Sequence, residues 1–273
     1  MENQRGRVTS AITLVSLVFL FLPLVVVVLF SFHSTAGLSF PFRGFSLRWY
    51  ERVLESEDFR AAALNSLWVA LPVAGVTLVL GTLAAYGLTR TSSRFRGPLA
   101  LLFFLPITVP GLFLGVSLLV FFARIDLQLS LTTVVIAHLV YVFPYFLLMA
   151  RAALDRLDPA LEEAAADLGA SPLLVFRRVT IPQIWPLLVG ATCLAFALSF
   201  DEFIITFFVV GSDSTLPLFI WSRLRRTVDP SINVISTALL VVSLGLWVVA
   251  FFLTARTERR RLRAAQPAVT ELP

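Results

Sequence analysis

Long runs of apolar residues, separated by short polar segments, dominate this chain. A helix that rises about 1.5 Å per residue needs roughly 20 apolar residues to cross about 30 Å of hydrocarbon. Six runs reach that length, and we expect each to be a membrane-spanning helix. Their approximate bounds are 8–32, 62–89, 98–123, 131–150, 183–210 and 232–254. The first run is too long for the apolar core of a secretory signal, so we expect it to be retained.

Proline and glycine residues fall inside the second and third runs. Such residues are tolerated in membrane helices where neighbouring helices satisfy the freed backbone groups. We therefore interpret both runs as kinked, closely packed helices and not as loops. The residues are Pro72, Gly75, Gly81, Pro106, Pro110, Gly111 and Gly115. No internal repeat is evident, so residues 1–273 are expected to form one all-α integral membrane domain.

The composition agrees with a membrane protein, since 58% of the residues are hydrophobic and only 14% are charged. A formal net charge of +5 would suggest nucleic-acid binding in a soluble protein. Here the basic residues lie between and after the apolar runs, where arginine sets membrane orientation. We expect a lipid bilayer, and no nucleic acid, as a partner.

The arginines favour a topology with both termini in the cytoplasm, because it places most of them inside, including the cluster from Arg256 to Arg263. Residues 255–273 would then be a cytoplasmic tail. This topology leaves Arg223, Arg225 and Arg226 outside. We interpret them as part of an interfacial helix with snorkelling side chains, and contact with an external protein stays open.

The chain has no lysine. Phosphate-binding loops of ATPases end in Gly-Lys-Ser/Thr, whose lysine holds the β and γ phosphates, so the chain carries no Walker-type nucleotide site. Cys193 is the single cysteine, which rules out an intrachain disulfide. No metal-ligand spacing or nucleophile arrangement is evident. We expect no metal, no cofactor bound by this chain and no enzymatic activity.

A polar, alanine-rich segment at residues 152–182 interrupts the apolar runs. Asp158 is a suitable N-cap for a helix, and the proline that follows it favours the first helical position. Gly169 suits the left-handed conformation that ends a helix. Ser171 and Pro172 repeat the start signal. The segment is therefore predicted to be helix, turn, helix.

The two short helices differ in the side chains that they carry. On the first, Leu161, Ala164, Ala165 and Leu168 fall on one stripe, which suits close approach by another surface. An ordinary amphipathic loop helix would show the same periodicity, so the stripe alone leaves both interpretations open. The second helix is predicted to end with Arg177 and Arg178, favourably placed against the helix dipole.

The pattern of this segment resembles the signature loop of ABC importer permeases. Glu163-Ala164-Ala165 is followed by three residues and Gly169, then by nine residues and Val179-Thr180-Ile181-Pro182. The family has Ile and Leu where this chain has Val179 and Ile181, which are conservative changes. The resemblance implies a type I importer permease fold, in which this loop is a coupling helix that docks into a groove on a separate ATPase subunit. The residues implied for ATPase coupling are Glu162, Glu163, Ala164, Ala165, Asp167, Leu168, Gly169, Ala170, Ser171, Pro172, Ile181 and Pro182.

The likeness extends on both sides of the loop, to the permeases of spermidine/putrescine importers. It includes the stretches 145–151, 199–203 and 216–218 together with Gly211, Ser222, Pro230 and Asn233. The resemblance implies a polyamine substrate, while importers of ferric iron, opines, thiamine or phosphonates share the pattern and stay alternatives. A self-contained ion-coupled secondary transporter is the rival from another class. The coupling pattern and the lack of an inverted repeat argue against it.

The resemblance also implies a set of partners in the bacterial cytoplasmic (inner) membrane. They are two ATPase subunits that bind ATP and Mg, a second permease subunit, and a periplasmic or extracellular substrate-binding protein. We expect the permease pair to be a heterodimer, and a pair of identical copies stays an alternative.

An acidic pair lies well inside the fifth apolar run, at Asp201 and Glu202. A carboxylate at bilayer depth costs ~2.5–3.5 kcal/mol on insertion scales unless it faces water, a partner or a cation. We hypothesise a weak acidic way-station for an ammonium-bearing solute. A structural hydrogen-bond role for one carboxylate, or no substrate contact by either, stays open.

Three further residues are candidates for the substrate path, namely Ser199, Asn65 and Tyr86. Asn65, Tyr86 and His138 are lone polar groups in apolar runs. Hydrogen bonds between helices would explain them as well as contact with a ligand.

Overall fold

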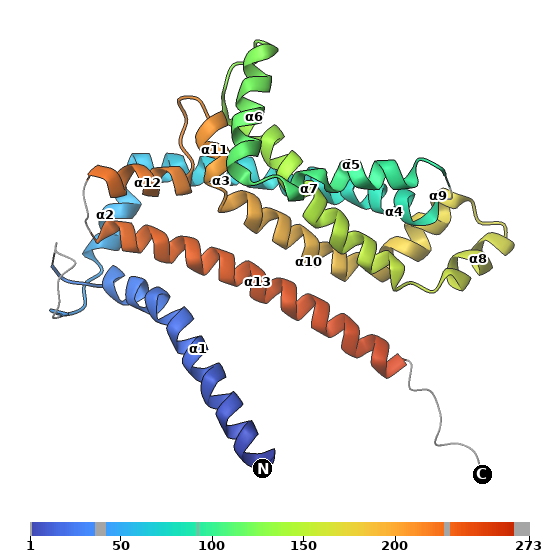
Figure 1. Cartoon of the computed structure of the whole chain (residues 1–273), viewed down its shortest axis with the longest axis horizontal. Coiled ribbons are helices and arrows are strands. Elements are labelled where there is room, and N and C mark those ends of the chain that lie inside the picture. The colour runs from blue at the N-terminus through green and yellow to red at the C-terminus, as the bar shows by residue number, and fades with distance from the viewer. Residues whose placement is uncertain (1, 36–41, 92, 227–229, 265–273) are drawn as a thin grey trace. The chain divides into compact units, whose positions relative to one another are not determined.

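The computed structural model describes residues 2–35, 42–91, 93–226 and 230–264, in which helices predominate (Figure 1). The end of the predicted tail, 265–273, lies outside these ranges. The α-helices are α1 (Glu2–Ser31), α2 (Arg48–Glu55), α3 (Glu57–Val76), α4 (Thr82–Arg90), α5 (Arg96–Thr108), α6 (Gly111–Arg124), α7 (Leu131–Asp155), α8 (Pro159–Asp167), α9 (Pro172–Val175), α10 (Ile181–Phe200), α11 (Ile204–Val209), α12 (Leu216–Arg226) and α13 (Ser231–Ala264). Two π-helical segments are η1 (Thr77–Gly81) and η2 (Phe176–Thr180).

The chain divides into two units, which we describe separately. The first contains Met1–Ala62 and Phe219–Val242, and the second contains Ala63–Leu218 and Ser243–Pro273. The prediction of one domain over residues 1–273 stays a prediction.

In the first unit, the short helix α2 buries Trp49 and Val53. The indole Nε1 of Trp49 donates a hydrogen bond of 2.8 Å to the backbone oxygen of His33. The guanidinium groups of Arg48 and Arg52 lie over the same indole ring, 4.5 and 4.9 Å from its centroid. One tryptophan therefore anchors this helix and also supports two cations.

The predicted helix before the last span is α12. Arg223 lies over the ring of Phe219, at 5.0 Å from its centroid, and forms an exposed ion pair of 3.5 Å with Asp58. Arg225 lies over Trp221 at 4.8 Å. The interpretation of α12 as an interfacial helix with snorkelling side chains stays a prediction.

The core of the second unit forms around α7, which contributes Val134, Ala137, Phe146 and Leu147 among its buried residues. Helices α4, α5, α6, α10 and α11 pack against it. A Cβ added at Gly81 would overlap the ring of Phe146. This glycine therefore lets two helices approach closely, as predicted for the second run.

The second apolar run is one continuous helix, Glu57–Arg90, which includes the π-helical segment η1. Proline and glycine do not break it, so its interpretation as a helix and not a loop is confirmed. Near the π segment, the hydroxyl of Thr77 donates a hydrogen bond of 2.7 Å to the backbone oxygen of Val73. Such a bond helps to satisfy the backbone where the regular pattern changes.

The third apolar run is broken, which corrects the prediction of a single kinked helix. Helices α5 and α6 meet at Val109 and Pro110 with a bend of 108°. Val109 has an extended conformation, with φ −90° and ψ 120°. The cause is local, because proline disfavours the helical conformation at the residue before it and donates no backbone hydrogen bond.

The fifth apolar run is also broken. Helix α10 ends at Phe200, and α11 begins only at Ile204. The predicted span 183–210 is therefore not one helix. Asp201 and Glu202 lie at the break between the two helices.

Within the described ranges, four helices are long and apolar enough to cross a membrane, and the bent pair α5–α6 raises this number to five. The four are Thr9–Ser31, Glu57–Arg90, Leu131–Asp155 and Pro172–Phe200. A shorter apolar stretch, Ser231–Leu246, covers part of the predicted last span. The all-α, multi-pass membrane architecture is confirmed, and the number of six spans stays a prediction.

Candidate functional site

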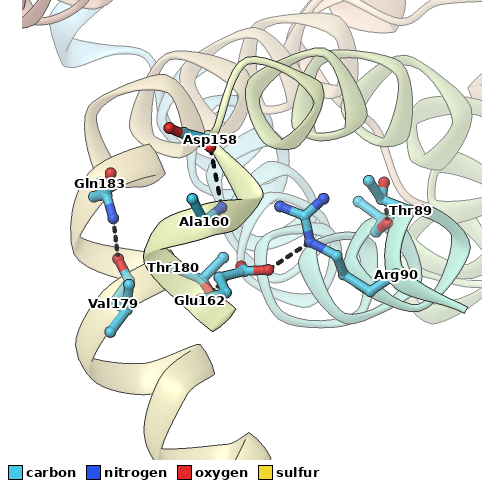
Figure 2. A network of polar contacts seen from close by, with 9 residues as sticks. Thr89, Arg90, Asp158, Ala160, Glu162, Val179, Thr180 and Gln183 are labelled. Carbon is cyan, nitrogen blue, oxygen red and sulfur yellow. Dashed lines mark hydrogen bonds and ion pairs between the residues drawn. The ribbon is translucent and has the colours of Figure 1, made fainter. Parts of the chain in front are cut away.

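The polar segment forms the predicted hairpin at one end of the second unit (Figure 1). Asp158 caps α8, since its Oδ1 accepts a hydrogen bond of 3.0 Å from the backbone N–H of Ala160 (Figure 2). Gly169 has φ +84°, the left-handed conformation expected of it. Ser171 is the N-cap of α9 and Pro172 its first residue. Both helix starts and the turn are therefore confirmed.

The end of the hairpin differs from the prediction. Helix α9 continues through η2 into α10, so residues Pro172–Phe200 form one helix of 29 residues. Arg177 and Arg178 lie in η2 and are exposed on its side. The prediction that they occupy a last helical turn is wrong, because the hydrogen-bonded backbone does not end there. The hairpin is directly continuous with the predicted fifth span.

The outer surface of the hairpin carries exposed leucines. Leu168 is 90% exposed, and Leu161 and Leu173 are also exposed. On the predicted stripe Ala164 is exposed, whereas Ala165 is half-buried. The hairpin thus exposes several large apolar side chains on one short polar segment, an arrangement common at protein–protein contacts.

Most other residues assigned to coupling lie on this same surface. Glu163, Asp167, Gly169, Ser171 and Pro172 are exposed, and Ala170 is half-buried. Ile181 and Pro182 begin α10, where Ile181 is half-buried and Pro182 is exposed. The hairpin therefore gathers these residues at one place, next to the start of α10.

Glu162 is placed differently from the other coupling residues. Its Oε1 accepts a hydrogen bond of 2.6 Å from the buried hydroxyl of Thr180 in η2. Its Oε2 lies 2.7 Å from Nε of Arg90, the last residue of α4, in an ion pair (Figure 2). The carboxylate thus faces helices of its own chain. Sequence reasoning missed the pairing of Arg90 with Glu162.

The acidic pair lies at the break between α10 and α11. Asp201 is exposed, and its Oδ2 accepts a hydrogen bond of 2.8 Å from the hydroxyl of Ser243 in α13. Glu202 is half-buried, and its Oε1 accepts one of 2.9 Å from the backbone N–H of Ile205. Glu202, which precedes the N-cap residue Phe203, therefore satisfies one of the free N–H groups at the start of α11.

A buried polar network adjoins this break. His138 of α7 bonds through Nδ1 to the hydroxyl of Ser199 at 2.8 Å and through Nε2 to that of Thr206 at 2.9 Å. The Thr206 hydroxyl also donates to the backbone oxygen of Glu202 at 3.0 Å. All three side chains are buried. Ser199 therefore joins α10 to α7, and the interpretation as hydrogen bonding between helices holds for His138.

Asn65 and Tyr86 have other partners. The amide of Asn65 donates a hydrogen bond of 2.9 Å to the backbone oxygen of Ser214. The ring of Tyr86 lies 4.7 Å from that of Phe176, between α4 and η2. The structure thus links Ser199 to the acidic break, but brings neither Asn65 nor Tyr86 to it through these contacts. Among the described residues, no three His, Cys, Asp or Glu side chains are placed to hold a metal ion.

Residues 77–263 match the family model described as binding-protein-dependent transport system inner membrane component. The chain belongs to this family. The family prediction from the loop motif is thereby confirmed. The permease is 35% identical over 266 residues, 94% of each chain, to the putrescine transport system permease protein PotI of Escherichia coli K12. It is 32% identical over 251 residues, 90% of this chain and 96% of the relative, to the spermidine/putrescine permease PotC of Haemophilus influenzae.

Solved structures of ABC transporters share the fold of the permease. A chain of a bacterial ABC transporter that imports the polysaccharide alginate aligns with a TM-score of 0.68 at 17% identity, over 98% of both chains. A chain of the methionine transporter MetNI aligns at 0.56 with 19% identity, over 75% of this chain and 98% of that one. At such low identity the likeness concerns the fold alone. The predicted importer-permease fold is confirmed.

Proposed function

We propose that this permease is the transmembrane subunit of an ATP-driven, binding-protein-dependent importer of polyamines, with spermidine and putrescine as substrates. The observation that carries the proposal is the 35% identity to a putrescine permease across 94% of both chains. The acidic break at Asp201 and Glu202 supports a cationic solute.

The exposed hairpin and the absence of lysine in the sequence support a separate ATPase partner. ATP and Mg are bound by two ATPase subunits, one of which covers the leucine-bearing surface of this hairpin. A second, different permease subunit completes the pore, and a periplasmic or extracellular binding protein delivers the solute. The hairpin and both termini then face the cytoplasm, and the complex resides in the inner membrane.

Alternating access would arise from movement of the hairpins. Closure of the ATPase subunits on ATP draws the two hairpins together and opens the helix bundle outward, and hydrolysis resets it.

The solute then passes the acidic break. A carboxylate has about four acceptor positions. Asp201 uses one of these for Ser243 and is exposed, so it retains capacity for an ammonium group.

Uptake into vesicles tests this proposal. The vesicles hold the assembled complex with its binding protein, and labelled spermidine or putrescine is added outside, with or without ATP on the side of the ATPases. We expect accumulation only with ATP. ATP hydrolysis that responds to the binding protein without polyamine entry would move the substrate to ferric iron, opines, thiamine or phosphonates. Uptake driven by an ion gradient without ATP would support the secondary transporter.

Neutralising the acidic break should lower uptake in the same assay. We expect the double variant Asp201→Asn, Glu202→Gln to take up polyamine about tenfold more slowly, because the attraction of a carboxylate for a nearby ammonium is worth a few kcal/mol at an effective dielectric constant of about 20. Glutamine keeps an oxygen for Ile205, so the cap of α11 survives. Asp213→Asn, an exposed acid outside the break, is the control. Unchanged uptake in the double variant, with normal assembly, would exclude the way-station.

A further inference from the structure

Helix α8 is attached to the second unit by little apolar burial. None of its residues is buried, and its large apolar side chain, Leu161, is exposed. Only Glu162 and Ala165 are half-buried. A helix of nine residues is also too short to be stable alone, since isolated helices need about 12–15 residues. The position of α8 therefore depends on its polar contacts.

Glu162 supplies contacts to two different long helices. Arg90 is the last residue of the helix Glu57–Arg90, and Thr180 lies in the first turns of the helix Pro172–Phe200. The two oxygens of one carboxylate are divided between them, at 2.7 and 2.6 Å (Figure 2). The side chains of Arg90 and Glu162 are only 23% and 13% exposed, so solvent screens the pair weakly.

The environment of Arg90 makes this contact hard to replace. Its Nη2 is buried and has no hydrogen-bond partner among the described residues. The contact between Nε and Oε2 is a close ion pair without the alignment of a hydrogen bond. Glu162 is therefore the acid that balances a half-buried guanidinium, and its loss would leave that charge without this partner.

The two long helices touch each other without Glu162. The rings of Tyr86 in α4 and Phe176 in η2 lie 4.7 Å apart at an angle of 59°. Removing the carboxylate would therefore release α8 while these helices stay packed. The role of Glu162 can thus be separated from the folding of the membrane helices.

We propose that Glu162 is a positioning residue for energy coupling, which fixes α8 to both long helices at once through Arg90 and Thr180. A displacement of α8 by the ATPase then moves both helices together. The coupling-motif neighbour Glu163 is exposed and remains available to the ATPase. This inference rests on the proposed function, because it assumes that an ATPase displaces α8.

Hydrogen exchange tests the attachment without any transport. The full-length permease in lipid nanodiscs, before partner subunits are added, is compared with Glu162→Gln and Thr180→Val. The control is Asp155→Asn, an exposed acid outside the coupling residues. We expect the rate of amide exchange in residues 160–168 to rise about tenfold in the first two variants. The reason is that losing the contact lowers the free energy of local opening, and about 1.4 kcal/mol corresponds to a tenfold change. Exchange in α7 and in the control should not change. Wild-type exchange of α8 in both variants would overturn the proposal.

Coupling is tested as polyamine taken up per ATP hydrolysed, in vesicles that hold the whole complex. This ratio is independent of how much complex is folded, so a merely structural defect would not move it. Glu162→Gln should lower the ratio several-fold while the binding protein still stimulates hydrolysis. Adding Arg90→Gln to it should cause little further loss, since the two side chains act as one pair.

The outcomes separate this inference from the function on which it rests. A wild-type ratio in Glu162→Gln, in a complex that imports polyamine with ATP, would overturn the positioning role and leave the importer intact. If the wild-type complex shows no ATP-driven uptake, the proposed function fails, and the exchange experiment still decides whether Glu162 holds α8.

Discussion

Replacing Gly169 by valine is expected to reduce ATP-driven uptake to background while the chain still inserts into the membrane. Gly169 has φ +84° in the turn between α8 and α9. The left-handed conformation costs an ordinary L-residue ~1–2 kcal/mol, and a β-branched one is a worse case. The turn would adopt another backbone conformation. The helices α8 and α9, with their exposed leucines, would then no longer hold their present relative orientation. Uptake per inserted complex, with insertion measured by immunoblotting of membranes, checks this result.

Asparagine at the same position is the matched control. No atom lies within 4 Å of a Cβ added at Gly169, so space is available and backbone conformation is the only cost. Asparagine adopts the left-handed region more readily than other residues, so Gly169→Asn should retain most uptake. Normal uptake by the valine variant would show that the turn is not needed for coupling.

Replacing Gly211 by alanine should destabilise the second unit more than other single methyl additions. Gly211 follows α11 with φ +71°, and an added Cβ would lie 2.5 Å from the backbone oxygen of Leu129. A backbone carbonyl cannot rotate away as a side chain can. Conformational strain of ~1–2 kcal/mol and overpacking of ~1–3 kcal/mol act together. We expect the thermal unfolding midpoint of the purified permease, followed by tryptophan fluorescence, to fall by several degrees.

Gly87→Ala is the control for this prediction. Gly87 lies in α4, and nothing lies within 4 Å of its added Cβ. Alanine favours helix over glycine by roughly 0.5–1 kcal/mol, so the midpoint should stay or rise slightly. Equal midpoints for the two variants would contradict the close approach of Gly211 to Leu129.

The hairpin could be predicted in detail because its signals are local. Asp158, Gly169, Ser171 and Pro172 each act on the backbone within a few residues, and short-range backbone preferences depend little on the rest of the fold. The length of the apolar runs likewise located most long helices, because the thickness of the bilayer sets how many apolar residues a spanning helix needs.

The helix breaks could not be predicted in this way. The residues on both sides of the breaks at Val109–Pro110 and Asp201–Phe203 are apolar. The mean hydropathy therefore stays high across each break and gives no sign of it. A break inside an apolar run is stable only where other groups satisfy the freed backbone, as Glu202 does for Ile205.

The orientation of Glu162 also could not be predicted from the sequence. Helical periodicity could not identify which side chains Glu162 would contact. Arg90 and Thr180 come from two other helices, and only the tertiary packing brings them to one carboxylate. A pattern of spacing within one loop contains no information on such partners.

The continuity of Pro172–Phe200 has a mechanical consequence. At about 1.5 Å per residue, this helix is about 44 Å long; it begins in the hairpin and ends at Phe200, next to Asp201. The helical backbone continues through η2 and through Pro182 and Pro186. A tilt of about five degrees at one end would displace the other by about 4 Å, given that length. If the proposed ATPase moves the hairpin, one uninterrupted helix, and no loop, connects that movement to the acidic break.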